Sequence, residues 1–121
     1  MIAWFEIPVA DMQRARKFYE TILDITITVN NFGQFVMGLF PDKPSIGQAN
    51  GALVQHEQYV PSLTEGALLY FACEDAATVL DKVEKAGGQV LQPKTEIGDG
   101  HGFMGLFKDT EGNRIALHSN A

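Results

Sequence analysis

Two distant stretches of the chain carry the same order of apolar and polar positions. Residues 4–11 read Trp-Phe-Glu-Ile-Pro-Val-Ala-Asp, and residues 68–75 read Leu-Leu-Tyr-Phe-Ala-Cys-Glu-Asp. Each stretch predicts a short strand that leads to an aspartate, Asp11 or Asp75. Because a carboxylate accepts hydrogen bonds from the free N–H groups of a first helical turn, we expect both aspartates to be helix N-caps.

Apolar residues at helical spacing follow each aspartate. They predict one helix at about residues 12–23 and a second at about residues 76–86, each with a single apolar stripe. The second helix is expected to end at Gly87-Gly88, because glycine commonly follows the last helical turn.

Each predicted helix is followed by three strand candidates. They lie at about residues 25–30, 34–40 and 51–55 in the first half of the chain, and at about 89–95, 102–107 and 114–119 in the second. The phrase Met-Gly-Leu-Phe occurs in the third strand of each half, at 37–40 and at 104–107. The loop before the last strand is long in the first half, at 41–50, and is an Asp-Thr-Glu-Gly-Asn hairpin turn at 109–113 in the second.

The same unit, β-α-β-β-β, is therefore predicted twice along the chain. The predicted modules cover about residues 1–57 and 67–121, and a linker at 58–66 joins them. Because each unit is too small to bury its apolar face alone, we expect the two modules to pair into one α+β domain that spans residues 1–121.

The composition of the chain limits the classes of molecule that the protein is expected to bind. The chain has 121 residues and a net charge of −6, which disfavours nucleic acid, because phosphate binding needs a basic face. The apolar run at 67–73 is too short to span a bilayer, and it holds the single cysteine, Cys73, so no intrachain disulfide is expected. No signal peptide is visible, and we expect a cytoplasmic protein that binds neither nucleic acid nor membranes.

The doubled unit and its motifs resemble the vicinal oxygen chelate superfamily, which includes glyoxalase I, bleomycin-resistance proteins, fosfomycin-resistance proteins and extradiol dioxygenases. The matching residues are the strand at 5–9 with its Asp11, Arg14-Ala15 and Phe18-Tyr19 in the first helix, Gly87-Gly88, and the run at 109–118. The resemblance implies two βαβββ modules paired into curved mixed sheets that enclose a cup. It fixes no single activity, because one fold hosts many functions.

The resemblance also implies where a metal would be held. Enzymes of this family use His and Glu side chains, one on the first and one on the last strand of each module, to hold one divalent ion that acts as a Lewis acid. The matching positions here carry side chains that cannot bind a metal: Trp4, Ala52, Leu68 and Ala116. We therefore expect no metal at the usual positions and no cofactor.

Strand alternation indicates which side chains face the cup. In the first strand, Phe5, Ile7 and Val9 share the apolar face that is expected to cover the helix, so Trp4 and Glu6 face the cup. The same alternation in the other strands completes a predicted ligand site of Trp4, Glu6, Ala52, Val54, Leu68, Tyr70, Ala116 and His118.

Three polar members of this set are candidates for catalysis: Glu6, Tyr70 and His118. Other interpretations stay open. Glu6 could pair with Arg114, Tyr70 could lie in the core, and His118 could be a solvent-facing strand end. His101, in the glycine-rich loop at 98–102, is either a lid residue over the cup or a surface histidine.

Three functions remain. The first is a homodimeric, metal-independent protein that binds a small aromatic or amphipathic molecule in the cup, as in the bleomycin-resistance branch. The second is a lyase or isomerase of the glyoxalase-like branch that holds a divalent metal with a relocated set including Glu6 and His118. The third is an interaction module without a ligand, which Glu6 disfavours, because a carboxylate is costly to bury unpartnered.

Overall fold

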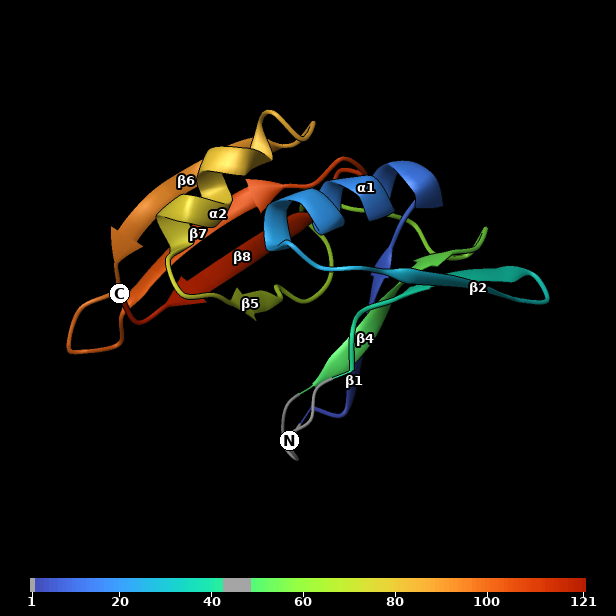
Figure 1. Cartoon of the computed structure of the whole chain (residues 1–121), viewed down its shortest axis with the longest axis horizontal. Coiled ribbons are helices and arrows are strands. Elements are labelled where there is room, and N and C mark those ends of the chain that lie inside the picture. The colour runs from blue at the N-terminus through green and yellow to red at the C-terminus, as the bar shows by residue number, and fades with distance from the viewer. Residues whose placement is uncertain (1, 43–48) are drawn as a thin grey trace.

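A computed structural model describes residues 2–42 and 49–121 of the chain (Figure 1). The first module contains β1 (Trp4–Pro8), α1 (Met12–Leu23), β2 (Thr28–Phe32), β3 (Phe35–Leu39) and β4 (Asn50–Gln55). The second contains β5 (Tyr70–Ala72), α2 (Ala76–Val83), β6 (Gln89–Glu96), β7 (Phe103–Lys108) and β8 (Arg114–Ser119). This order confirms the repeated β-α-β-β-β unit. Most of the long loop predicted at 41–50 lies outside the described residues.

Each module forms its own four-stranded mixed sheet. The strand orders are β1-β4-β3-β2 and β5-β8-β7-β6, and in both sheets the first strand pairs in parallel with the last, whereas the other pairings are antiparallel. The helices α1 and α2 pack against each other where the two sheets meet (Figure 1). The face of each sheet that is turned away from its helix is the predicted cup face.

The two predicted N-caps are confirmed. The Asp11 carboxylate accepts a hydrogen bond from the backbone N–H of Arg14 at 3.1 Å, and that of Asp75 accepts one from Ala77 at 2.9 Å. Capping satisfies one otherwise unpaired N–H group at the start of each helix. The sequence therefore placed both helix starts from local chemistry alone.

The ends of the helices and strands agree less closely with those predicted from the sequence. β4 and β6 differ from expectation by one residue at one end, β3 and β7 by one residue at both ends, and α2 ends at Val83 rather than at residue 86. β2 begins at Thr28 rather than at residue 25, because the Glu20 carboxylate accepts the backbone N–H of Ile27 at 2.9 Å and ties the residues after α1 back to the helix.

The repeated phrase Met-Gly-Leu-Phe marks the point where each helix presses on its sheet. A Cβ atom added at Gly38 would lie 2.9 Å from the sulfur of Met12 in α1, and one added at Gly105 would lie 2.6 Å from Leu80 in α2. Only glycine allows this close approach without displacing the helix side chain. The repeat therefore has a packing cause.

The helix sides of both sheets merge into one apolar core. Ile7 and Val9 are fully buried in it, as the alternation in the first strand predicts, and Phe5 is half-buried. Phe5 of the first module meets Phe71 of the second edge to face, with ring centroids 5.6 Å apart. The two modules thus share one apolar core, and their assignment to one domain stays a prediction.

The hairpin turn at 109–113 fastens the second module to the first. Its Glu111 side chain is fully buried and accepts the backbone N–H groups of Ala10 and Asp11, each at 2.8 Å, and the Nε–H of Arg14 at 2.7 Å. Burial alone raises the pKa of the Glu111 carboxyl, but the hydrogen bonds it accepts, first that from Arg14, outweigh burial, so the net pKa lies below its ordinary value of 4.5.

Two other residues of the turn are also buried. The phenol of Tyr19 donates to the Asp109 carboxylate at 2.6 Å. The Asn113 amide donates to the backbone oxygen of Pro8 at 2.7 Å, and its oxygen accepts the N–H of Ser62 at 3.1 Å. This turn therefore also holds the end of β1 and the linker in place. No helix within 2–42 and 49–121 is long and apolar enough to cross a membrane.

Candidate functional site

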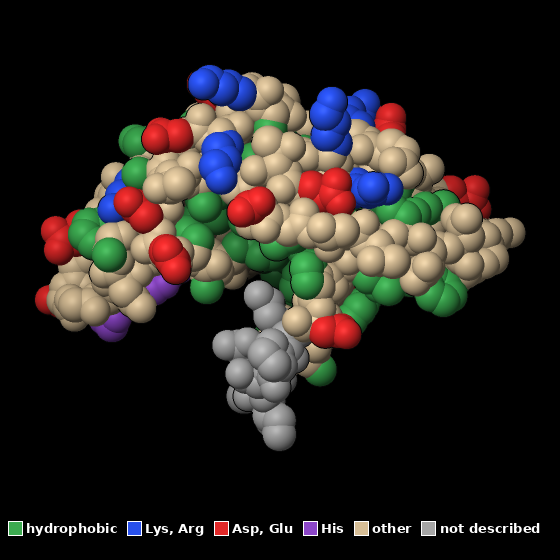
Figure 2. Space-filling model, in the orientation of Figure 1, with side chains coloured by type: hydrophobic (Ala, Val, Ile, Leu, Met, Phe, Trp, Pro, Cys, Tyr) green, Lys and Arg blue, Asp and Glu red, His purple; other side chains and the backbone are tan. Residues whose placement is uncertain are grey.

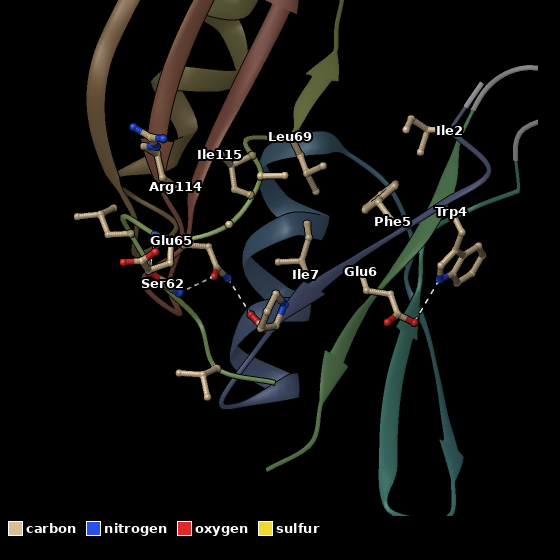
Figure 3. Close-up of a pocket in the computed structure, with 16 residues that line it drawn as sticks. Ile2, Trp4, Phe5, Glu6, Ile7, Ser62, Glu65, Leu69, Arg114 and Ile115 are labelled. Carbon is tan, nitrogen blue, oxygen red and sulfur yellow. Dashed lines mark hydrogen bonds between the residues drawn. The ribbon is translucent and has the colours of Figure 1, made fainter. Parts of the chain in front are cut away.

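A hollow of the described chain opens beside β1. It has a volume of about 580 Å³ and lies between β1, the linker and the start of β8 (Figure 3). We call it the β1 cleft and define it by seven of its lining residues, which come from β1 and the segment before it, from the linker and from β8: Ile2, Trp4, Glu6, Val60, Leu63, Glu65 and Arg114.

Large apolar side chains of the β1 cleft are exposed to solvent. The exposed fractions are 66% for Ile2, 44% for Trp4, 71% for Val60 and 40% for Leu63. Figure 2 shows hydrophobic side chains in the recess between the two lobes of the molecule, whereas lysine and arginine gather on the side of the helices. Exposed apolar side chains that share one hollow are typical of a binding surface.

Glu6 is held in a fixed orientation at this cleft. The phenol of Tyr59 donates to Oε1 of Glu6 at 2.7 Å, and the indole N–H of Trp4 donates to Oε2 at 3.3 Å. Figure 3 draws the bond from Trp4. The hydrogen bond to Glu6, together with burial and the negative charge of Glu6, raises the pKa of Tyr59, so the phenol keeps its proton and remains a donor.

The expected alternative partner of Glu6, Arg114, does not pair with it. The ion pairs formed within residues 2–42 and 49–121 are Arg14–Glu111, Arg16–Glu20 and Lys94–Asp75. Arg114 also lines the β1 cleft, but it enters from β8, and its guanidinium is turned away from Glu6 (Figure 3). The interpretation of Glu6 as an Arg114 salt-bridge partner is therefore wrong for the described chain.

Sequence reasoning missed Tyr59, because it falls in the stretch assigned to the linker. Its ring lies edge-on to Phe35, with centroids 5.9 Å apart, and 6.0 Å from His56, which itself stacks on Phe35 at 4.2 Å. These rings support the phenol that reaches Glu6. The only sequence signal was an aromatic residue within a short, proline-containing linker.

The second sheet positions the other polar candidates. Tyr70 pairs with Ala116 across β5 and β8, and Ala72 pairs with His118. Tyr70 is 53% exposed, so its assignment to the core is wrong. His118 is half-buried, and its Nε2 lies 2.7 Å from the backbone oxygen of His101, which requires Nε2 to carry a proton and donate.

The contact with His118 is also where the loop at 98–102 meets the sheet. His101 itself is exposed, and only its backbone oxygen takes part in the contact. This geometry places the loop over the end of β8 but does not test whether it closes over a ligand, so the lid role of His101 remains a prediction.

The predicted site residues fall into two groups on two sheets. Glu6 and Trp4 lie on β1, whereas Tyr70 and His118 lie on β5 and β8, and the two sheets share no strand in the described chain. The β1 cleft includes Glu6 and Trp4 but neither Tyr70 nor His118. The β1 cleft therefore does not contain both Glu6 and His118, and a joint role of the two residues remains a prediction.

The small residues of the predicted site lie beneath their neighbours. Ala52, Val54 and Ala116 are fully buried, and Leu68 is half-buried. Short side chains in the middle of a sheet are covered by the longer side chains of adjacent strands. None of the four residues lines the β1 cleft, so their role in a ligand site stays a prediction.

The side chains at the family's usual metal positions do not fit a divalent ion. Trp4, Ala52, Leu68 and Ala116 offer no anionic oxygen, imidazole or thiolate. Within residues 2–42 and 49–121, no three His, Cys, Asp or Glu side chains gather as a metal site. The relocated candidates each already have hydrogen-bond partners: Glu6 accepts from Trp4 and Tyr59, and His118 donates to the backbone oxygen of His101.

Comparison with known proteins places these features in a family context. A family model described as Glyoxalase/Bleomycin resistance protein/Dioxygenase superfamily matches residues 1–117. A glyoxylase-like domain-containing protein of Didymella fabae is 28% identical over 126 residues, which cover 96% of this chain and 91% of that protein. The putative glyoxylase CFP32 of Mycobacterium tuberculosis is 29% identical over 94% of this chain, which spans only 43% of its length.

Solved structures show the same fold. A glyoxalase I mutant from Zea mays aligns with a TM-score of 0.73 at 17% identity, over 98% of this chain and 46% of its own. A glyoxylase/bleomycin resistance protein/dioxygenase domain from Frankia sp. EAN1pec aligns with a TM-score of 0.73 at 21% identity, over 98% and 96% of the two chains. At these identities the likeness concerns the fold alone.

Proposed function

This chain belongs to the glyoxalase/bleomycin resistance protein/dioxygenase superfamily, and we propose that it binds a small organic molecule at the β1 cleft, without a metal at the family's usual ligand positions. The observation that carries the proposal is the pairing of exposed apolar side chains with an oriented carboxylate, Glu6, in one hollow. A hollow of about 580 Å³ lies within the range of small-molecule sites.

The proposal includes a homodimer. Trp4 and Tyr70 are both exposed on the cup faces of their sheets, at 44% and 53%. A second copy that closes over these faces, with the ligand between the two copies, would remove apolar surface from water and could bring a Glu6 and a His118 to one cup, while Trp4 stays in contact with the ligand. Sedimentation equilibrium tests this part, and a chain that stays monomeric at high concentration contradicts it.

Trp4 offers a direct test of binding, because it is the only tryptophan of the chain. We expect small aromatic compounds to change its fluorescence and to raise the thermal unfolding temperature. Leu63→Ser should weaken binding, whereas Leu91→Ser should not. The two leucines form a matched pair, since they are 40% and 39% exposed and only Leu63 lines the β1 cleft. Equal effects of the two substitutions would count against the site.

A metal-dependent lyase or isomerase is the alternative. Elemental analysis of protein purified without added metal or chelator, followed by titration with Mn²⁺, Ni²⁺ and Zn²⁺, separates the two functions. The proposal predicts no binding tighter than surface carboxylates provide. About one tightly held ion per chain, lost in both Glu6→Ala and His118→Ala, would contradict it and would support a relocated ligand set.

A further inference from the structure

We propose that the molecule bound at the β1 cleft is an organic cation, with an amine or ammonium group against Glu6 and an apolar or aromatic body over Trp4. This inference rests on the proposed function and adds the chemical class of the ligand. It follows from the charge of Glu6, from the rings that hold it, and from the character of the surrounding cleft.

The charge of Glu6 is oriented but not neutralised within the described chain. Both of its hydrogen-bond donors, the phenol of Tyr59 and the indole of Trp4, are neutral groups. The three ion pairs formed by residues 2–42 and 49–121 all lie elsewhere. A carboxylate has about four lone-pair sites, so two accepted bonds leave room for a further donor.

The same two donors bring aromatic rings to the carboxylate. The Trp4 nitrogen is 3.3 Å from Oε2 and the Tyr59 oxygen is 2.7 Å from Oε1, so the carboxylate lies at the edges of both rings. An ammonium group that pairs with Glu6 therefore leaves the face of the Trp4 ring for the apolar or aromatic body of the same ligand. Trp4 keeps 44% of its surface exposed, so a ligand can reach its ring.

The rest of the cleft suits the body of such a ligand. Ile2, Val60 and Leu63 offer exposed apolar surface. Glu65 adds a second carboxylate to the lining, and the one basic side chain in it, Arg114, is turned away from Glu6 (Figure 3). The net charge of −6, with lysine and arginine gathered on the helix side, further favours a cation over an anion (Figure 2).

A series of compounds with one ring and three headgroups tests the inference. Trp4 fluorescence is titrated with 2-phenylethylamine, which is cationic, 2-phenylethanol, which is neutral, and phenylacetate, which is anionic. We expect the amine to bind about fivefold more tightly than the alcohol, and phenylacetate to bind most weakly. Glu6→Gln should abolish the preference for the amine. Asp81→Asn, which removes an exposed carboxylate on α2, should retain it.

The preference can also be tested without any substitution. Added salt should reduce the affinity for the amine and leave that for the alcohol nearly unchanged. If the amine and the alcohol bind equally at low salt, or if phenylacetate binds most tightly, the cation inference is overturned while binding at the cleft still stands. If none of the three compounds changes Trp4 emission, both the inference and the proposed site are overturned.

Discussion

Two glutamates of this protein occupy contrasting environments. Glu111, in the turn at 109–113, is fully buried and accepts two backbone N–H groups as well as the guanidinium of Arg14. Glu6, at the β1 cleft, is exposed and accepts only the neutral donors of Tyr59 and Trp4. Both carboxylates are oriented by several hydrogen bonds. Only Glu111 has its charge matched by a cation of the chain itself.

The contrast distinguishes a carboxylate that stabilises the fold from one that stays accessible to other molecules. The contacts of Glu111 join the second module to the start of α1, so its hydrogen-bonding capacity is used in holding the fold together. Glu6 retains both its charge and access to solvent. A family motif such as the turn at 109–113 therefore identifies the fold, whereas a binding site is proposed here at a polar group that the fold leaves available.

The largest expected effect is that of Glu111→Gln. The N–H groups of Ala10 and Asp11 both donate to Oε1, which the amide oxygen can replace, but the amide N–H₂ group then faces the Nε–H of Arg14. Because the substitution also removes the charge beside Arg14, we expect a loss of about 2–3 kcal/mol in the free energy of unfolding. The matched substitution Glu6→Gln should cost less than about 0.5 kcal/mol, because Glu6 is exposed. Urea denaturation measures both. Equal losses would remove the distinction between the two glutamates.

Asn113→Ala should have the next largest effect. It removes the bond to the backbone oxygen of Pro8, the bond to Asp109, and the acceptor for the N–H of Ser62, at a cost of about 2 kcal/mol. Because Ser62 lies in the linker beside the β1 cleft, ligand binding should also weaken. If the variant is destabilised but binds the ligand as tightly as the wild type, the hydrogen bonds of Asn113 contribute to the fold alone.

The stabilisation by Glu111 should depend on pH. Its folded-state pKa is depressed, so its contribution is fully present above the ordinary value of 4.5 and is lost as the pH falls through the lower folded-state pKa. The difference in stability between wild type and Glu111→Gln should therefore be constant between pH 5.5 and 7, as about one unit above 4.5 leaves the group ionised in both states, and should shrink in more acidic buffers. Urea denaturation across a pH series measures it, and a difference that grows toward acid would contradict the assignment.

Tyr59→Phe should give the smallest effect. The variant keeps the ring packed near Phe35 and His56 but no longer orients Glu6, so affinity for 2-phenylethylamine should fall about threefold. Titration of Trp4 fluorescence measures the change. The control is 2-phenylethanol, whose affinity should hardly move, and a loss of equal size for the alcohol would assign Tyr59 to shaping the cleft.

Much of the fold could be predicted, because it depends on residues that are close together in the sequence. Asp11 and Asp75 cap helices as expected, and alternation placed Ile7 and Val9 in the core. The start of β2 could not be placed, since the Glu20 bond to Ile27 that delays it depends on the chain folding back on α1. The role of Glu111 was equally hidden, because its partners Ala10 and Asp11 lie at the other end of the sequence.

The candidate site was predictable only in part. Alternation placed Trp4 and Glu6 together on one face, and the structure puts both at the β1 cleft. It could not identify Tyr59, whose bond to Glu6 spans 53 residues and follows no periodic pattern. Nor could it foresee that Ala52 and Val54 are buried, since alternation gives the face of a side chain but not what covers it.

The most direct test of the central contrast is an amide NMR titration of the labelled protein with 2-phenylethylamine. If the β1 cleft is the open site and the turn at 109–113 is closed by its own contacts, the signals of Trp4, Glu6 and the residues around Val60 should shift, whereas Glu111 should not. Shifts centred on the turn, or spread evenly over the charged surface of the molecule, would contradict the assignment of Glu6 to binding and of Glu111 to the fold.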